Sequence, residues 1–265
     1  MLPRLLAWLI ATVFCCAQMA LAEEESVVQQ APIRIGYIEF PPYSSTDSQG
    51  QAVGELIDLI RLLAQRAGYR ANFIEYPSFR LFKAMEAGQI EMAPSLLNHP
   101  VMQRYTLLSR YLIVQVKLNL YYQEKLSPWS LSDLHDSRLL QIQGLVYPGS
   151  PLTSLVKDPA WGIARSTAPN HLAAVQMMHL QRAEYLLDYQ DPAEAAFSES
   201  GLPPLPHTTL LQEDFTFAYS KRSPRARQLR DDLDRTLEHL LQRGDIPQRF
   251  TGIVPYKAGD ISQSP

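Results

Sequence analysis

The stretch IRIGYIEFPPY at residues 33–43, followed by GELIDLIRLLAQRAG at residues 54–68, decides the fold. The first part alternates apolar and polar residues as a half-buried strand does, and its two prolines then require a loop. In the second part Leu56, Leu59 and Leu63 recur at helical spacing, and Gly68 ends the pattern. This stretch therefore predicts a strand, a loop and an amphipathic helix.

The residues that follow repeat this order. A strand is predicted at residues 72–76, a helix at 79–87 that stops at Gly88, and a third strand at 90–97. Strands that alternate with helices form parallel sheets with helices on their faces. We therefore expect such a sheet from residues 33–97.

The rest of the chain shows the same two kinds of element, separated by a break at residues 127–129. A long, partly aromatic strand precedes the break, and a Leu-rich helix comes near the end. The predicted strands are 112–122, 139–143, 184–188 and 215–219, the predicted helices 170–180 and 224–242, and residues 202–206 form a proline-rich connection.

Composition excludes several classes of protein. Of the 265 residues, 46% are hydrophobic and 19% charged, which does not fit a disordered chain. The formal net charge of −3 argues against a protein that neutralises many phosphates, so we expect no nucleic-acid partner. The His residues do not recur at metal-ligand spacing, and no Gly-rich phosphate loop is present, so we expect neither metal nor cofactor.

Residues 1–22 have the pattern of a secretory signal. Arg4 precedes an apolar run, and small residues at 20 and 22 then meet the requirements of a signal peptidase. Cleavage after Ala22 would remove both cysteines, Cys15 and Cys16, and leave a thiol-free protein from Glu23 onward. We therefore expect a soluble periplasmic protein without disulfides.

Five pieces of the chain resemble, in order, the family 3 extracytoplasmic solute-binding proteins, whose best-known members deliver polar amino acids to ABC importers. They include the opening strand with its Pro-aromatic loop, a Gly-x-x-x-Asp-Leu helix start, and a helix-Gly-x-Ile-acidic segment in which Glu91 replaces Asp. The pieces are residues 33–43, 54–59, 79–91, 131–144 and 215–250.

This resemblance implies an α/β protein with the two-lobed fold of type 2 periplasmic binding proteins. Each lobe would be a mostly parallel sheet flanked by helices, and two crossover strands, near 118–122 and 210–217, would act as hinges. Lobe 1 would comprise residues 31–121 and 215–254, lobe 2 residues 122–214, and residues 255–265 a tail. A monomer with an interlobe ligand cleft is expected.

The resemblance also suggests which residues of lobe 1 bind the ligand. They are aromatic residues near the first strand and the second helix, together with polar residues after the third strand. The alternatives are a loop shaped only by its prolines, with one ring in the core, and an Arg that is merely solvated. The candidates are Tyr37, Phe40, Tyr43, Phe79, Arg80, Ser95 and Asn98.

The next segment departs from the family pattern. Amino-acid-binding members have an Arg here that clamps the ligand carboxylate. Counting from Glu91 puts Gln103 at this position, whereas counting back from Ser109 puts Met102 there. Arg104 would need a shift of one or two residues in the loop to reach the cleft. The alternative is that the protein does not clamp a carboxylate at this place.

In lobe 2, Gln143 at the end of a strand is the candidate for a polar ligand contact. The family pattern also has an Asp that pairs with the ligand ammonium, five residues after Arg-x-Asp. Here Asp188 comes at four residues, and one residue along a strand changes the face. Asp188 therefore either reaches the ligand or points away and leaves Tyr189 facing inward.

Three functions remain open. The chain captures a small polar solute, an amino acid or a related compound, for a membrane ABC permease. Alternatively it is an orphan or sensory binding protein of the same fold. A third possibility is an exported enzyme resembling cyclohexadienyl dehydratase, which would need a general acid in the cleft. No residue is clearly arranged for that role, so a non-enzymatic protein is expected.

Overall fold

The structure, a computed structural model, describes residues 31–123 and 130–256. From Pro32 onward the chain forms one compact unit, and residues 1–31 are not part of it. The predicted signal peptide at residues 1–22 lies outside the described residues, and so does most of the predicted tail at 255–265. No helix in the described ranges is both long enough and apolar enough to cross a bilayer.

The predicted order of strands and helices between residues 33 and 97 is confirmed. Strand β1 (Ile33–Tyr37) is parallel to both of its neighbours, β4 (Ala71–Glu75) and β5 (Met92–Leu96). Helices α2 (Glu55–Arg66) and α3 (Ser78–Ala87) connect these strands. One face of α2 is buried, as its spacing predicts, through Leu56, Ile57, Leu59, Ile60, Leu63 and Ala64.

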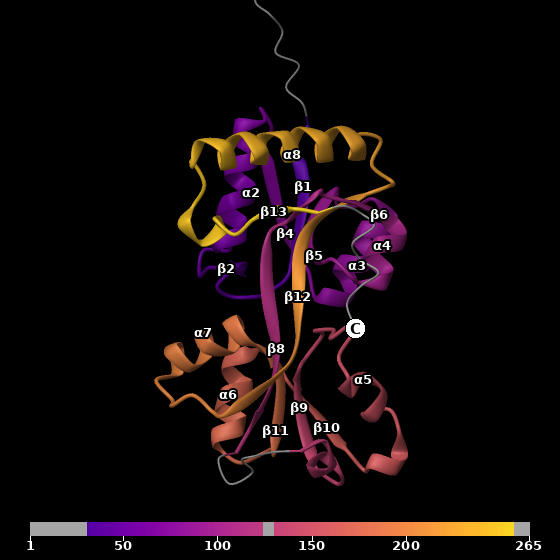
Figure 1. The fold of residues 1–265 in the computed structure, drawn as a ribbon, viewed down its shortest axis with the longest axis vertical. Coiled ribbons are helices and arrows are strands. Elements are labelled where there is room, and N and C mark those ends of the chain that lie inside the picture. The colour runs from indigo at the N-terminus through magenta and orange to yellow at the C-terminus, as the bar shows by residue number, and fades with distance from the viewer. Residues whose placement is uncertain (1–30, 124–129, 257–265) are drawn as a thin grey trace, which may run out of the picture. The chain divides into compact units, whose positions relative to one another are not determined.

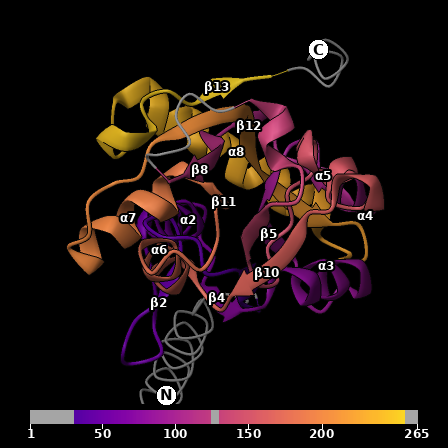
Figure 2. The same cartoon turned by 90° about the horizontal axis from the view of Figure 1, so that it is seen from below.

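A second set of parallel strands lies lower in Figure 1. Strand β9 (Arg138–Ile142) is parallel to β10 (Ala164–Ala168) and to β11 (Tyr185–Tyr189). Helices α6 (His171–His179) and α7 (Gln190–Ser200) lie together on one side of these strands, and the short α5 (Leu152–Leu155) lies on the other (Figure 2).

Two long antiparallel strands run between these two sets (Figure 1). Strand β8 (Val114–Tyr122) pairs with β12 (His207–Ser220), and a register shift interrupts the pairing between Thr209 and Leu211. The main sheet is therefore continuous, in the order β10-β9-β11-β8-β12-β5-β1-β4. Both predicted crossover segments lie in these strands, while the predicted lobe boundaries stay a prediction.

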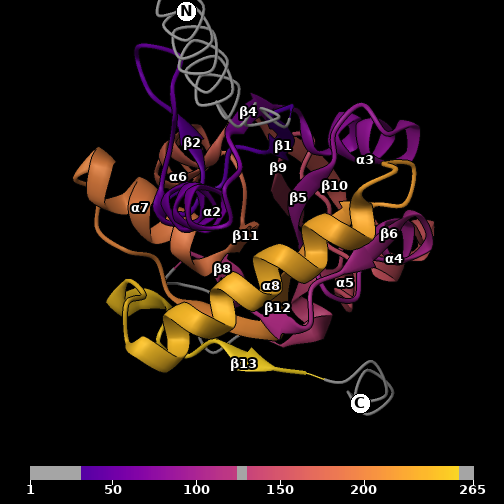
Figure 3. The same cartoon turned by 90° about the horizontal axis from the view of Figure 1, so that it is seen from above.

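We call the part around β1, β4 and β5 the upper region and the part around β9, β10 and β11 the lower region, as oriented in Figure 1. Helix α8 (Ala226–Arg243) extends across the top of the upper region and contacts α2 (Figure 3). The upper region also contains β2 (Ser45–Thr46), β3 (Ala52–Val53), α4 (Pro100–Tyr105), β6 (Thr106–Leu108), β7 (Tyr111–Leu112) and β13 (Val254–Pro255).

Some elements differ from the sequence-based prediction. Helices α4 and α7 and strand β10 were not predicted, and β12 begins at His207, eight residues before the predicted strand. Helix α7 is short of long apolar residues, since its buried face consists of Pro192, Ala193, Ala196 and Phe197. Helical periodicity is therefore weak there, and packing rather than pattern accounts for the helix.

The loop after β1 is held against the start of α2 by backbone hydrogen bonds. The N–H of Glu55 donates to the carbonyl of Pro42 (3.0 Å), and the N–H of Leu56 donates to that of Tyr43 (2.9 Å). Gly54 has φ 121°, and a Cβ atom there would lie 2.5 Å from the Tyr43 carbonyl oxygen. Glycine is therefore required at this position by both conformation and space.

Candidate ligand-binding cleft

Two adjoining cavities lie between the upper and lower regions. The smaller has a volume of about 40 Å³ and the larger about 460 Å³, and Ile38, Ser78 and Leu145 line both. Ile38 and Ser78 belong to the upper region, whereas Leu145 follows β9 in the lower region. We call the smaller one the apolar cavity and the larger one the polar cavity, and the two together form the cleft.

Aromatic rings form the walls of the apolar cavity. Phe40 comes just after β1. Its ring centroid lies 5.2 Å from that of Tyr189 at the end of β11 and 5.6 Å from that of Phe215 on β12. Leu145 and Val146 of the lower region also line this cavity. The loop after β1, the end of β11 and strand β12 thus bring three rings into one cluster. Their centroid distances are typical of aromatic pairs.

A half-buried carboxyl group lies behind this cluster. The Tyr189 hydroxyl donates to Oε2 of Glu213 on β12 (2.9 Å). Burial raises the pKa of Glu213 to about 7, and the hydrogen bond from Tyr189 opposes this shift only partly. Glu213 is therefore a group on β12 with a pKa near neutral pH.

The polar cavity has a different lining. Glu39 and Glu75 contribute carboxylates from the upper region, and Gln143 and Asn170 contribute amides from the lower region. Thr46 joins the two carboxylates, because its N–H donates to Oε1 of Glu39 (2.7 Å) and its hydroxyl donates to Oε2 of Glu75 (3.1 Å). This cavity therefore presents hydrogen-bond acceptors.

His171 also lines the polar cavity, at the first position of α6. Its Nδ1 lies 2.8 Å from Oδ2 of Asp188, which is fully buried and also accepts from the N–H of Tyr189. Nε2 of His171 is buried and has no hydrogen-bond partner among the described residues. A buried polar atom without a partner is unusual and requires an explanation.

A polar cluster ties the upper region to the lower one. Asp191, in the first turn of α7, accepts from the Tyr43 hydroxyl (2.9 Å) and from Nη2 of Arg249 (3.1 Å). Arg249 also donates to the Tyr43 oxygen and pairs with Glu55. Burial raises the pKa of Tyr43 to about 12, so its hydroxyl remains a donor. We call the contacts of Asp191 with Tyr43 and Arg249 the Asp191 bridge.

The structure brings several of the predicted site residues to the cleft. Phe40 and Ser95 line the apolar cavity and Gln143 lines the polar cavity. Tyr43 and Asp188 lie beside it, the first in the Asp191 bridge and the second behind His171. A direct role in ligand binding stays a prediction for all five.

Other predicted residues do not line the cleft. Tyr37 lies within 2.8 Å of the Thr46 hydroxyl and packs against Phe73. Phe79 is 65% exposed, and Asn98 is exposed. Arg104, also exposed, lies over the ring of Tyr105, 5.4 Å from its centroid. Ligand binding by these residues stays a prediction that their positions do not favour.

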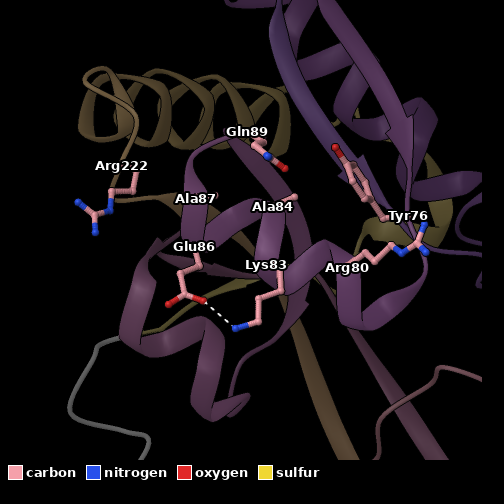
Figure 4. Close-up of a pocket in the computed structure, with 8 residues that line it drawn as sticks. All are labelled: Tyr76, Arg80, Lys83, Ala84, Glu86, Ala87, Gln89 and Arg222. Carbon is pink, nitrogen blue, oxygen red and sulfur yellow. Dashed lines mark hydrogen bonds and ion pairs between the residues drawn. The ribbon is translucent and has the colours of Figure 1, made fainter.

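Arg80 lies in a different hollow. This outer groove of about 750 Å³ is a surface feature beside α3, lined by Arg80, Lys83, Arg222 and neighbouring residues (Figure 4). Lys83 pairs with Glu86 across one turn of the helix, at 3.4 Å. The groove is larger than the cleft, but long charged side chains form much of it and it lacks the lower region's residues. We therefore place the candidate site in the cleft, where buried rings and polar side chains of both regions converge.

Sequence reasoning missed several residues of the cleft. His99 lines the apolar cavity with its ring 4.2 Å from Phe82, and burial lowers its pKa. His171 had one available signal, because it opens a predicted helix directly after a connection between elements. The sequence held no signal for Glu213, because its raised pKa results from burial in the folded protein. No grouping of His, Cys, Asp and Glu that could hold a metal ion occurs within residues 31–123 and 130–256.

Solved structures share this fold. A histidine kinase sensor domain with similarity to periplasmic binding proteins is 16% identical, with a TM-score of 0.70 over 86% of this chain and 100% of that one. A mutant of ArgBP from T. maritima is 15% identical, with a TM-score of 0.66 over 83% and 94% of the two chains. An ancestral amino acid-binding protein, a precursor of cyclohexadienyl dehydratase, is 18% identical, with a TM-score of 0.63 over 83% and 93%.

At these identities the structures demonstrate a common fold and nothing finer. No curated protein matches the chain. A family model for bacterial extracellular solute-binding proteins, family 3, matches residues 33–251, which is most of the sequence. The chain therefore belongs to family 3 of the bacterial extracellular solute-binding proteins.

Proposed function

We propose that this protein captures a small polar solute in the cleft and closes on it by a movement about β8 and β12. The observation that carries this proposal is that residues of both regions form the walls of the cavities. Phe40 comes from the upper region, Tyr189 and Leu145 come from the lower one, and Phe215 lies on a connecting strand. A rotation of one region would therefore open and close both cavities.

The lining favours a solute other than an ordinary α-amino acid. Carboxylate recognition in proteins relies on Arg, whose planar guanidinium binds both oxygens. No Arg or Lys of the described residues lines either cavity, and Arg104 lies elsewhere. Recognition would instead rest on aromatic walls, amides and acceptors.

Binding rather than catalysis is proposed, although the Asp188–His171 pair has the composition of an acid–base pair. In this structure Nε2 of His171 is buried, and no second polar side chain contacts it. Recovery of the bound compound, followed by mass spectrometry, should return it chemically unchanged.

We further propose that the protein acts in the periplasm, with an ABC permease as its partner. A sensory role is the second candidate, because the histidine kinase sensor domain is matched over its entire length. Reconstituted uptake distinguishes the two, since only an importer component makes transport of the solute depend on this protein.

A thermal-shift screen of the exported protein tests solute capture. A compound that binds the native state raises the melting temperature in proportion to ln(1 + [L]/Kd). Gln143→Ala, in the polar cavity, should reduce the shift, whereas the matched change Gln65→Ala on the exposed face of α2 should not. If no cationic, anionic, zwitterionic or neutral compound gives a shift, solute capture is wrong.

A further inference from the structure

The charges around the polar cavity all have one sign. Glu39 and Glu75 line it, and within the described ranges no Lys or Arg does so. Arg80 lies in the outer groove, which meets the polar cavity only at Tyr76. The cavity therefore favours a positively charged group and disfavours an anionic one.

The two carboxylates are held rather than free. Thr46 binds Oε1 of Glu39 through its N–H and Oε2 of Glu75 through its hydroxyl. The short strand pair β2–β3 holds Thr46 in turn, where Thr46 is opposite Ala52. One oxygen of each carboxylate remains available to a ligand, so the pair is preorganised to accept hydrogen bonds.

His171 provides an independent indication of a ligand on the same cavity wall. Its ring is 4% exposed, its Nδ1 is bound by Asp188, and its Nε2 has no partner in the described chain. When the Nδ1 proton points at Asp188, Nε2 of the neutral ring is an acceptor. The ring of Phe40, an upper-region residue, lies nearly perpendicular to this ring with the centroids 6.4 Å apart, so opening of the cleft would uncover it.

The apolar cavity adjoins these acceptors directly, since Ile38, Ser78 and Leu145 line both spaces. A ligand with a charged end among the acceptors would therefore place its remaining atoms against Phe40, Tyr189 and Phe215. Those rings would bury an aliphatic or aromatic body.

We propose that the solute is an organic primary amine, with a short aliphatic or aromatic body and no carboxylate. Its ammonium group binds the Glu39–Glu75 pair and Nε2 of His171, and its body packs against Phe40, Tyr189 and Phe215 in the apolar cavity, which must widen from about 40 Å³ as the cleft opens. This inference rests on the proposed function and specifies the class of solute for the same cleft.

Compounds that share a hydrocarbon body but differ in their charged groups test the inference by calorimetry. One set is 3-methylbutylamine, leucine and 4-methylpentanoate, and the other is phenethylamine, phenylalanine and 3-phenylpropionate. In at least one set we expect the amine to bind roughly tenfold or more tightly than its two counterparts, because a carboxylate would approach Glu39 and Glu75. Absence of binding by both amines overturns the inference, as does equal or tighter binding of the acids or amino acids.

Variants locate the binding group. In Glu39→Gln/Glu75→Gln the acceptors that Thr46 binds are retained while both charges are lost, and amine affinity should fall about tenfold. The matched control Glu199→Gln, at the exposed end of α7, should bind as the unaltered protein does. Unchanged affinity in the double variant contradicts the proposed ammonium site.

The two proposals fail in different ways. If acids or zwitterions bind in the cleft and the amines do not, the amine class is wrong and solute capture stands. If compounds of every charge class leave the melting temperature unchanged, solute capture itself is wrong.

Discussion

Two clusters, each built on a carboxylate and an arginine, differ in what they hold together. Glu91 in the upper region is 3% exposed and accepts two hydrogen bonds from Arg225, both 2.9 Å, and one from Ser223. In the Asp191 bridge the Arg249 side chain is 42% exposed, and the pair joins the upper and lower regions. Burial makes the first pair a fixed part of one region, whereas exposure to water leaves the second weak enough to break.

The largest expected effect comes from breaking the buried pair. Burial tends to raise the pKa of Glu91, but hydrogen bonds from Arg225, Arg34 and Ser223 outweigh it and hold the pKa at about 2. Glu91→Ala should lower the free energy of unfolding by about 3 kcal/mol, because Arg225 keeps a partly buried charge. Chemical denaturation measures this, with Asp58→Ala, which loses an exposed pair with Arg61, as the control.

The same pair sets a pH dependence. Because the pKa of Glu91 is lower in the folded protein than the ordinary 4.5, its contribution is present above pH 4.5 and is lost as the pH falls towards 2. Glu91→Ala should flatten the stability curve in that range. An identical acid dependence in the variant would show that the pair contributes little.

Glu213 extends the comparison to a half-buried carboxyl whose hydrogen-bond partner is the neutral Tyr189 hydroxyl instead of an arginine. Its pKa, raised from 4.5 to about 7, favours the neutral form in the folded protein. Stability should therefore fall as the pH rises from 4.5 to 7. Glu213→Gln should remove this slope and add about 2 kcal/mol at pH 8, as urea titrations at several pH values can measure. A steeper slope in the variant contradicts the assignment.

The Asp191 bridge should affect conformation more than stability. Asp191→Asn weakens the ion pair with Arg249, and an exposed pair contributes about 1 kcal/mol or less. We therefore expect almost unchanged unfolding but a larger radius of gyration without solute, measured by small-angle scattering. Glu199→Gln at the other end of α7 is the control. An unchanged radius would mean that the aromatic cluster alone holds the regions together.

The smallest effect is expected at Arg104. Its side chain lies over Tyr105 and does not line the cleft. Arg104→Lys should change solute affinity by no more than about 0.5 kcal/mol, as calorimetry would show, since a substitution on the surface rarely does more. A tenfold loss of solute affinity would show that Arg104 belongs to the site and would support a carboxylate clamp.

The strands and helices that could be predicted are those with a clear apolar period. Leu56, Leu59 and Leu63 determine α2 without reference to the rest of the chain. Helix α4 could not be predicted in this way, because it has no apolar period and is defined by the His99 cap, which accepts from the Met102 N–H, by Pro100 at its first position and by the core position of Met102. That short helix also explains why counting failed to find a clamp, since Met102 is buried and Arg104 is exposed.

For β11 the sequence could predict two alternatives but could not decide between them, because consecutive strand residues point to opposite faces. Asp188 and Tyr189 are consecutive in β11, so one lies behind the cleft with His171 and the other lines it. The sequence alone did not decide which of these two side chains faces the cleft. The Asp188–His171 contact and the Asp191 bridge join residues from different elements, and no local pattern specifies such pairs.

Gly54 links these observations, because its backbone packs against the carbonyls of Pro42 and Tyr43. That loop carries Phe40 into the aromatic cluster and Tyr43 into the Asp191 bridge. In a saturation scan of the whole chain scored by solute binding, position 54 would therefore resemble a contact residue although it lines neither cavity. Its score would report how accurately a backbone turn places two rings, Phe40 in the wall of the apolar cavity and Tyr43 in the contact that joins the halves of the protein.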